Sequence, residues 1–180
     1  MRVCIFAGSR KGTNPAYEQK AYELGKVLAT KGMTVVYGGS SGGLMGALAN
    51  GAIEMGGEVI GVMPHQLEGI EISHSKLSQL IQVETMHERK SKMAELADSY
   101  IALPGGFGTL EELTETITWA QIGLHQKPIG LLNVAGYYTP FMTMVDHAIE
   151  SGFVDASQRQ MLKLEEDPVH LVEALLKEKA

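Results

Sequence analysis

The sequence has little cysteine, and it has neither long hydrophobic runs nor blocks of one charge. Its one cysteine, Cys4, has no intramolecular partner and lies in an apolar run, which excludes a disulfide framework and suits a reducing compartment. The first apolar run, residues 1–7, is too short for the core of a signal peptide, and no later run approaches the ~20 apolar residues of a membrane span. We therefore expect a cytoplasmic protein that crosses no membrane.

Positive charge is also scarce. The chain of 180 residues has 15 Lys and Arg against 21 Asp and Glu, which gives a formal net charge of −6. A negative chain without a basic block is unsuited to long nucleic acid, although one basic pocket could hold a single phosphate. With 44% hydrophobic residues and no linker, we expect one domain spanning residues 1–180, with a small-molecule partner.

Glycine is plentiful, with 21 residues that cluster after apolar runs. Short β-branched or apolar runs alternate with segments of helical spacing, a pattern typical of a parallel sheet covered on both faces. We predict an α/β fold, Rossmann-like, with helices on both faces of a single sheet. The predicted strands are residues 3–7, 34–37, 59–63, 80–83, 100–103 and 129–132. The predicted helices are residues 16–31, 44–55, 87–97, 109–122, 138–151, 156–162 and 169–179, and residues 64–76 form a loop with a short helical turn.

Three predicted strands end in glycine-rich loops, at residues 8–10, 38–43 and 104–108. In parallel α/β sheets such loops lie beyond the carboxyl ends of the strands, where ligands bind, and each leads to a helix whose free N–H groups attract anions. The loops therefore favour a phosphate site at one edge of the sheet. The alternative is that these glycines only allow tight turns between strand and helix.

The standard phosphate fingerprints are missing from these loops. After Gly106-Phe107-Gly108, the position where G-x-G-x-x-G requires its third glycine is Glu111, and no loop ends in the G-K-[S/T] of a P-loop. The sequence thus disfavours dinucleotide cofactors and triphosphate hydrolysis.

Two charged clusters follow predicted strand ends. Glu111 and Glu112 lie in the first turn of a helix, where the helix dipole favours carboxylates. Because neighbours on a helix are about 100° apart, we expect that they do not both face one pocket, so that one is functional and the other structural. Arg89 and Lys90 begin another helix, where they could hold a phosphate or polarise a leaving group. The alternative is that these charged residues only form a solvated helix face without a functional role.

Other chemistries find no support. The six histidines have no metal-ligand spacing, so we expect no metal site. The serines of the glycine loops lack the G-x-S-x-G elbow of serine hydrolases. No motif stands out for a lysine in Schiff-base linkage to pyridoxal phosphate, and we expect no cofactor.

Two motifs carry a resemblance to a known family. Residues 104–112, Pro-Gly-Gly-Phe-Gly-Thr-Leu-Glu-Glu, resemble the PGGxGTxxE signature of the LOG family, the cytokinin riboside 5′-monophosphate phosphoribohydrolases. Residues 86–90, Met-His-Glu-Arg-Lys, match the family's M-H-x-R-K motif at the expected distance upstream. The similarity also includes the glycine segment 38–46 and residues 117–121, so it covers most of the chain. Many members were once labelled possible lysine decarboxylases.

The resemblance implies hydrolysis of the N-glycosidic bond of an N6-modified adenosine 5′-monophosphate, by a homodimer whose sites lie near the interface. It makes Arg89 and Glu112 the catalytic pair. The loop around Glu71 departs from the plant-like pattern, which points to a different base pocket. The resemblance places these residues around the substrate: Gly8, Ser9, Gly43, Glu71, Met86, Lys90, Gly105, Gly106, Phe107, Gly108, Thr109, Leu110, Glu111 and Thr118.

Two alternatives to this enzyme remain. A protein that carries or senses a nucleotide or a molybdenum cofactor would need the same loops without the chemistry of Glu112. The inherited lysine decarboxylase label would require pyridoxal phosphate, which an absorbance spectrum would reveal. The sequence does not say whether the substrate is a cytokinin nucleotide or plain AMP.

Overall fold

The computed structural model describes residues 1–67, 69 and 71–178. It confirms the predicted α/β class, with a parallel sheet of seven strands in the order β4-β3-β2-β1-β5-β6-β7. The strands are β1 (Arg2–Phe6), β2 (Thr34–Tyr37), β3 (Val59–Pro64), β4 (Gln79–Val83), β5 (Ser99–Ala102), β6 (Ile129–Leu132) and β7 (Leu162–Glu165). The helices are α1 (Pro15–Thr30), α2 (Gly43–Glu54), α3 (Met86–Leu96), α4 (Phe107–Gln121), α5 (Thr139–Glu150) and α6 (Pro168–Lys177). Short 3-10 turns occur at η1 (His65–Leu67), η2 (Val134–Gly136) and η3 (Ala156–Met161).

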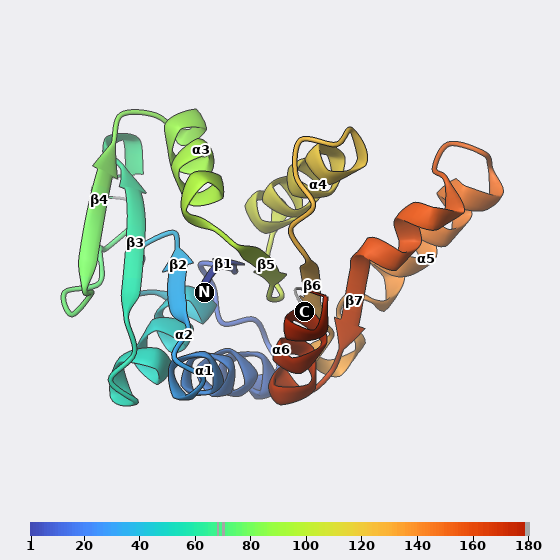
Figure 1. The fold of residues 1–180 in the computed structure, drawn as a ribbon. Coiled ribbons are helices and arrows are strands. Elements are labelled where there is room, and N and C mark those ends of the chain that lie inside the picture. Colours follow the sequence, from blue (N-terminus) through green and yellow to red (C-terminus); the bar gives the residue numbers. More distant parts are fainter. Residues whose placement is uncertain (68, 70, 179–180) are drawn as a thin grey trace.

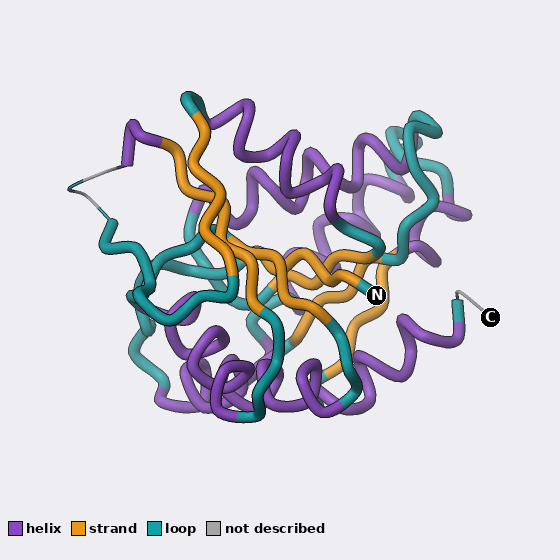
Figure 2. Tube along the Cα trace, turned by 60° about the vertical axis from the view of Figure 1, so that its left-hand side comes forward, coloured by secondary structure: helices purple, strands orange, loops and turns teal. Residues whose placement is uncertain are grey.

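The sheet separates two layers of helices, which lie above and below it in Figure 1 and again in Figure 2. Side chains alternate along each strand, so β1 directs Val3 and Ile5 into one core and Cys4 and Phe6 into the other. The first core also contains residues of α1, α2 and α6, and the second contains residues of α3, α4 and α5. The helices therefore cover both faces, as the unbroken apolar strands predict.

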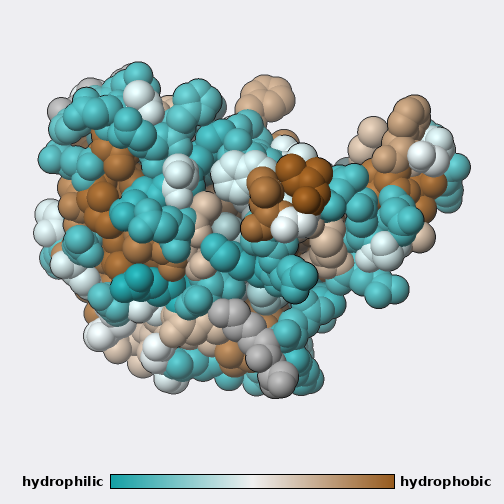
Figure 3. Space-filling view, turned by 45° about the horizontal axis from the view of Figure 1, so that its top comes forward, coloured by the Kyte–Doolittle hydropathy of each residue, from teal (hydrophilic) through white to brown (hydrophobic). Residues whose placement is uncertain are grey.

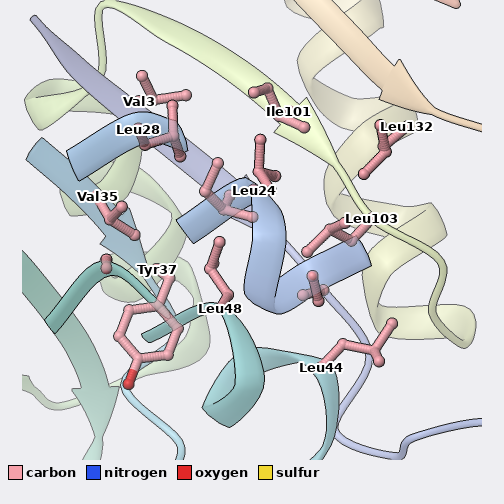
Figure 4. Close-up of a cluster of buried hydrophobic side chains, with 14 of the residues drawn as sticks. Val3, Leu24, Leu28, Val35, Tyr37, Leu44, Leu48, Ile101, Leu103 and Leu132 are labelled. Carbon is pink, nitrogen blue, oxygen red and sulfur yellow. The ribbon is translucent and has the colours of Figure 1, made fainter. Parts of the chain in front are cut away.

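The core beneath α1 and α2, whose buried leucines are drawn in Figure 4, includes a close contact between the two helices at two glycines. A Cβ atom on Gly25 of α1 would lie 2.1 Å from the Leu48 carbonyl oxygen, and one on Gly51 of α2 would lie 2.1 Å from that of Tyr22. Both helices approach each other more closely than any side chain at these two positions would allow. Leu24, Leu28 and Leu48 pack around this contact.

One predicted element was wrong. Residues 156–162 were expected to form a helix, but residues 156–161 form the 3-10 turn η3, and Leu162 begins β7. Strand β7 has the sequence Leu-Lys-Leu-Glu, a short alternation at the edge of the sheet, which the helical interpretation overlooked. The predicted loop between β3 and β4 does contain a short helical turn, η1. None of the described helices is long and apolar enough to cross a membrane.

The strand order places the ligand edge of the sheet. Strand β1 lies between β2 and β5, so the chain order reverses direction beside β1, and the loops after β1 and β5 flank the crevice where α/β sheets bind ligands. The two loops are joined by a hydrogen bond from the Gly8 N–H to the Pro104 carbonyl oxygen, 3.1 Å long. Two of the three predicted glycine loops thus meet directly at this edge.

Candidate active site

A cavity of about 250 Å³ opens at the carboxyl edge of the sheet, next to the start of α4 and the first turns of α3. Most of the substrate and catalytic residues that the sequence suggested line it, but their roles stay predictions. These are Gly8, Ser9, Glu71, Met86, Arg89, Gly106, Phe107, Gly108, Thr109, Glu111 and Glu112.

Five other candidates lie outside this cavity. Gly105 lines a neighbouring cavity, and Lys90 lines a small hollow on the other side of Glu112. Gly43 packs against the backbone of Ser9. Leu110 packs against the core, and the Thr118 hydroxyl of the exposed face of α4 donates to the Thr114 carbonyl oxygen.

The start of α4 is open to an anion. Its cap residue, Gly106, has no side chain to accept a hydrogen bond, and the first recorded bond of the helix is from the Leu110 N–H to the Gly106 carbonyl oxygen. Within the part of the chain that the structure describes, the N–H groups of residues 107–109 have no recorded acceptor. Free N–H groups at a helix start attract anions, so a phosphate fits here.

The starts of the neighbouring helices are occupied instead. The side chains of Asn14 and Thr85 cap α1 and α3. At α2, the N–H groups of Leu44 and Met45 donate to the Gly8 carbonyl oxygen, at 3.0 and 3.4 Å. The second glycine loop therefore serves mainly to hold the first, and the third loop is the one suited to phosphate.

Arg89 is buried beneath the cavity. Its Nε donates to the Val62 carbonyl oxygen at 3.1 Å, and its Nη2 donates to the Gly38 carbonyl oxygen at 3.0 Å. Gly38 permits this arrangement, since a Cβ atom there would lie 1.8 Å from Nη2. The alternative of a solvated helix face is therefore wrong for Arg89, which brings a fixed positive charge to the cavity.

Glu112 is a carboxylate with unusual acid–base properties. Burial raises its pKa from 4.5 to about 7, although the nearby Arg89 charge opposes the rise and Glu111 adds to it. A carboxyl group that titrates near neutral pH is suited to accepting and releasing protons. The burial of Glu112 and its raised pKa are therefore compatible with the predicted role of a general base.

Glu111 has a different environment, although it lines the same cavity. Its carboxylate lies 2.5 Å from the Lys90 Nζ, which also lies 3.0 Å from Glu115. Burial would lower the pKa of Lys90, but its hydrogen bonds to the two carboxylates outweigh that effect, and its pKa is raised. The expectation that Glu111 and Glu112 do not face one pocket was wrong, because the cavity extends around the first turn of α4.

Glu71 enters the cavity from the loop that follows η1. The loop is held by hydrogen bonds from the Ser41 N–H to the Ile72 carbonyl oxygen and from the His74 N–H to the Gly39 carbonyl oxygen. The Glu71 Oε2 is buried and has no recorded hydrogen-bond partner in the described structure. A buried carboxylate oxygen without a donor is costly, so this position favours a ligand with hydroxyl or amino groups.

Sequence reasoning missed several cavity residues. Gly38, Met45 and Met93 line the cavity, along with Ile5 and Ala7. Gly38 belongs to a loop that was expected to hold phosphate, and its real partner is Arg89. The two methionines are apolar positions that no sequence pattern distinguishes from core. Among the described residues, no three His, Cys, Asp or Glu side chains gather so as to hold a metal ion.

Comparisons with solved structures confirm the fold. A molybdenum cofactor binding protein from Rippkaea orientalis superposes with a TM-score of 0.74 at 22% identity, covering 99% of this chain and 97% of that one. The molybdenum cofactor carrier protein of Chlamydomonas reinhardtii gives a TM-score of 0.71 at 23% identity, covering 98% and 96%. At these identities the similarity concerns the fold alone.

Comparisons of sequence identify the family. The family model described as possible lysine decarboxylase matches residues 45–175. A probable cytokinin riboside 5′-monophosphate phosphoribohydrolase of Oryza sativa is 48% identical over 174 residues, 97% of this chain and 71% of that protein. A cytokinin riboside 5′-monophosphate phosphoribohydrolase of Arabidopsis thaliana is 46% identical over 174 residues, 97% and 76%. With the two motifs around one cavity and relatives aligned over nearly the whole chain, the protein belongs to the LOG family of cytokinin riboside 5′-monophosphate phosphoribohydrolases.

Proposed function

We propose that this protein hydrolyses the N-glycosidic bond of an N6-substituted adenosine 5′-monophosphate, releasing the free purine base and ribose 5-phosphate. The observation that carries the proposal is the combination within one cavity of Glu112, whose pKa is raised to about 7, with the uncapped start of α4. One feature suits the chemistry at the sugar and the other suits the phosphate.

The phosphate anchors the substrate in this proposal. The free N–H groups at the start of α4 bind its oxygens, and the helix dipole favours its negative charge. Glu71, with its unpartnered buried oxygen, accepts hydrogen bonds from the ribose hydroxyls or the base. Fixing both ends of the ribose 5-phosphate holds C1′ in a constant position relative to Glu112, which reduces the entropy that the reaction has to lose.

The reaction itself relies on Glu112. As the bond between C1′ and the purine nitrogen lengthens, positive charge develops on the ribose, and the carboxylate stabilises it as in O-glycoside hydrolysis. A water molecule attacks C1′ and gives a proton to Glu112, while the electron pair of the broken bond leaves with the purine, which takes up a proton. Arg89, held by two carbonyl oxygens, acts on the carboxylate by keeping its pKa from rising further.

A second copy of the chain completes the site in this proposal. The cavity of about 250 Å³ is below the usual size of a ligand pocket, ~300–1,000 Å³. Large apolar side chains are exposed at both ends of α4: Phe107, at the cavity, is 92% exposed, and Ile122 and Leu124, just after the far end of the helix, are 63% and 69% exposed. Brown apolar areas interrupt the polar face shown in Figure 3. A homodimer packed on α4 would cover such side chains and bring Thr118 toward the partner's cavity.

A carrier of a nucleotide-like cofactor is the second candidate, supported by the fold shared with molybdenum cofactor carrier proteins. A carrier needs the phosphate site but no general base, so the raised pKa of Glu112 favours the hydrolase.

A substrate comparison tests the proposal. Purified protein is incubated with an N6-isopentenyladenosine 5′-monophosphate, with AMP and with the matching nucleosides that lack the phosphate, and free base is quantified by chromatography. We expect the monophosphates to be far better substrates, because nucleosides lose the contact that positions the ribose. Equal turnover with and without the phosphate would contradict the assignment of the α4 start.

A further inference from the structure

The phosphate loop is held from behind through three successive carbonyl groups. The Leu103 carbonyl oxygen accepts from the Tyr138 hydroxyl at 2.7 Å, and the Pro104 carbonyl oxygen accepts from the Gly8 N–H at 3.1 Å. The Gly105 carbonyl oxygen accepts from the Tyr137 hydroxyl. Two consecutive tyrosines and one backbone N–H therefore fix the carbonyl orientations of this short segment.

The carbonyl orientation determines where the next N–H points. In a planar trans peptide, the C=O of one residue and the N–H of the following residue point in opposite directions. When Tyr137 holds the Gly105 carbonyl on the side away from the catalytic cavity, the Gly106 N–H is directed to the other side. Gly105 and Tyr137 line the cavity behind the loop, whereas Gly106 lines both cavities. A flip of this one peptide would direct a carbonyl oxygen toward the phosphate.

Glycine makes the restraint necessary. Gly105 and Gly106 have no Cβ atom, so their peptide can rotate more freely than most. A Cβ on Gly105 would lie 2.1 Å from the Thr109 Oγ1, so a less flexible residue cannot be used there. The loop therefore gains its fixed geometry from outside, through the hydroxyl of Tyr137.

Tyr137 is itself held firmly in place. Its ring packs edge to face on Tyr17, with centroids 6.0 Å apart, and on Tyr138, at 5.1 Å. The turn η2 before it contains Ala135 at φ 51°, the one non-glycine residue with positive φ among the described residues. The Asn133 side chain accepts from the Tyr138 N–H at 2.8 Å and stabilises the same turn. Strained backbone of this kind persists where the surroundings hold it, and it is frequent near functional sites.

We propose that Tyr137 is a positioning residue that directs the Gly106 N–H into the phosphate site by holding the Gly105 carbonyl group. The inference rests on the proposed function, since it takes the start of α4 as the phosphate site. Tyr137 contacts no reacting atom, and it acts through the Gly105–Gly106 peptide.

The test uses Tyr137→Phe, which removes the hydroxyl and keeps the ring. Tyr17→Phe is the matched control, since it removes a neighbouring hydroxyl that has no recorded partner in the described structure. Inhibition constants are measured for ribose 5-phosphate and for adenosine, which lacks a phosphate. Loss of one hydrogen bond corresponds to about a three- to tenfold increase in an inhibition constant. We expect Tyr137→Phe to weaken the binding of ribose 5-phosphate by that factor and the binding of adenosine by less than twofold. Tyr17→Phe should have the same inhibition constants as the wild type.

The outcomes separate this inference from the proposed function. If wild-type protein binds neither probe, the proposed function and this inference both fail. If it binds both, and Tyr137→Phe weakens them equally or not at all, this inference alone fails. A second measurement needs no variant: in wild-type protein titrated with ribose 5-phosphate, the Gly106 amide proton resonance should shift together with those of residues 107–109. A Gly106 amide that does not respond would refute the assigned orientation.

Discussion

Replacing Glu112 by glutamine should make the protein more stable at high pH and much less active. The carboxyl group has a folded-state pKa of about 7 against an ordinary value of 4.5, because burial penalises its charge. Because the folded-state pKa is raised, Glu112 costs the protein no stability below pH 4.5, where the carboxyl group is protonated in both the folded and the unfolded states. As the pH rises from 4.5 through 7, the free energy of unfolding falls. At about 1.36 kcal/mol per pKa unit, the charged carboxylate lowers the free energy of unfolding by about 3 kcal/mol above pH 8.

Urea denaturation at pH 5 and pH 8.5 measures this effect. Between these two values the wild type loses most of that free energy through Glu112, whereas glutamine does not titrate. The free energy of unfolding of Glu112→Gln, relative to that of the wild type, should therefore increase by about 2–3 kcal/mol from pH 5 to pH 8.5. Effects of other titrating groups are common to both proteins and cancel.

The same variant should lose activity. Glutamine keeps the size of the side chain but neither opposes the developing positive charge nor takes the proton from water, so we expect kcat to fall by ~10²-fold or more while nucleotide still binds. Glu95→Gln, at an exposed position of α3, is the control. It should change neither kcat nor the dependence of the free energy of unfolding on pH. Our account of Glu112 would be refuted by a stability difference that is the same at both pH values, or by normal kcat.

Two further predictions concern pH and assembly. For the wild type, kcat/KM should fall about tenfold for each pH unit below about 7, because protonation of Glu112 in the free enzyme removes the general base; a profile that is flat from pH 5 to 8 would contradict this. Light scattering should give about twice the chain mass of 19.5 kDa, and activity per chain should fall on dilution through the dissociation range; a fully active monomer would refute the shared site.

The sequence predicts the parts of this protein that depend on local pattern. The apolar runs identified six of the seven strands, and the glycine loops correctly indicated the carboxyl edge of the sheet. Strand β7 was missed because four alternating residues at a sheet edge give a weak signal, and neighbouring residues of η3 resemble a helical turn. Short edge strands are defined by the sheet they join more than by their own residues.

The site shows the same division between local and long-range features. Arg89 and Glu112 were found through their motifs, but the burial of Arg89 against Gly38 joins residues 51 positions apart, and no sequence pattern reports it. Likewise, Tyr137 is 32 positions from Gly105, with which it forms a hydrogen bond. Such contacts depend on how the chain folds, so the raised pKa of Glu112 could be seen only in three dimensions.

Product analysis tests the central claim most directly. Wild-type protein is incubated with N6-isopentenyladenosine 5′-monophosphate, and free base, ribose 5-phosphate, nucleoside and inorganic phosphate are quantified together over time. Cleavage of the N-glycosidic bond by water predicts free base and ribose 5-phosphate in equal amounts, with the rate reduced ~10²-fold in Glu112→Gln. Release of nucleoside and inorganic phosphate, or tight binding of the nucleotide without any product, would contradict the account.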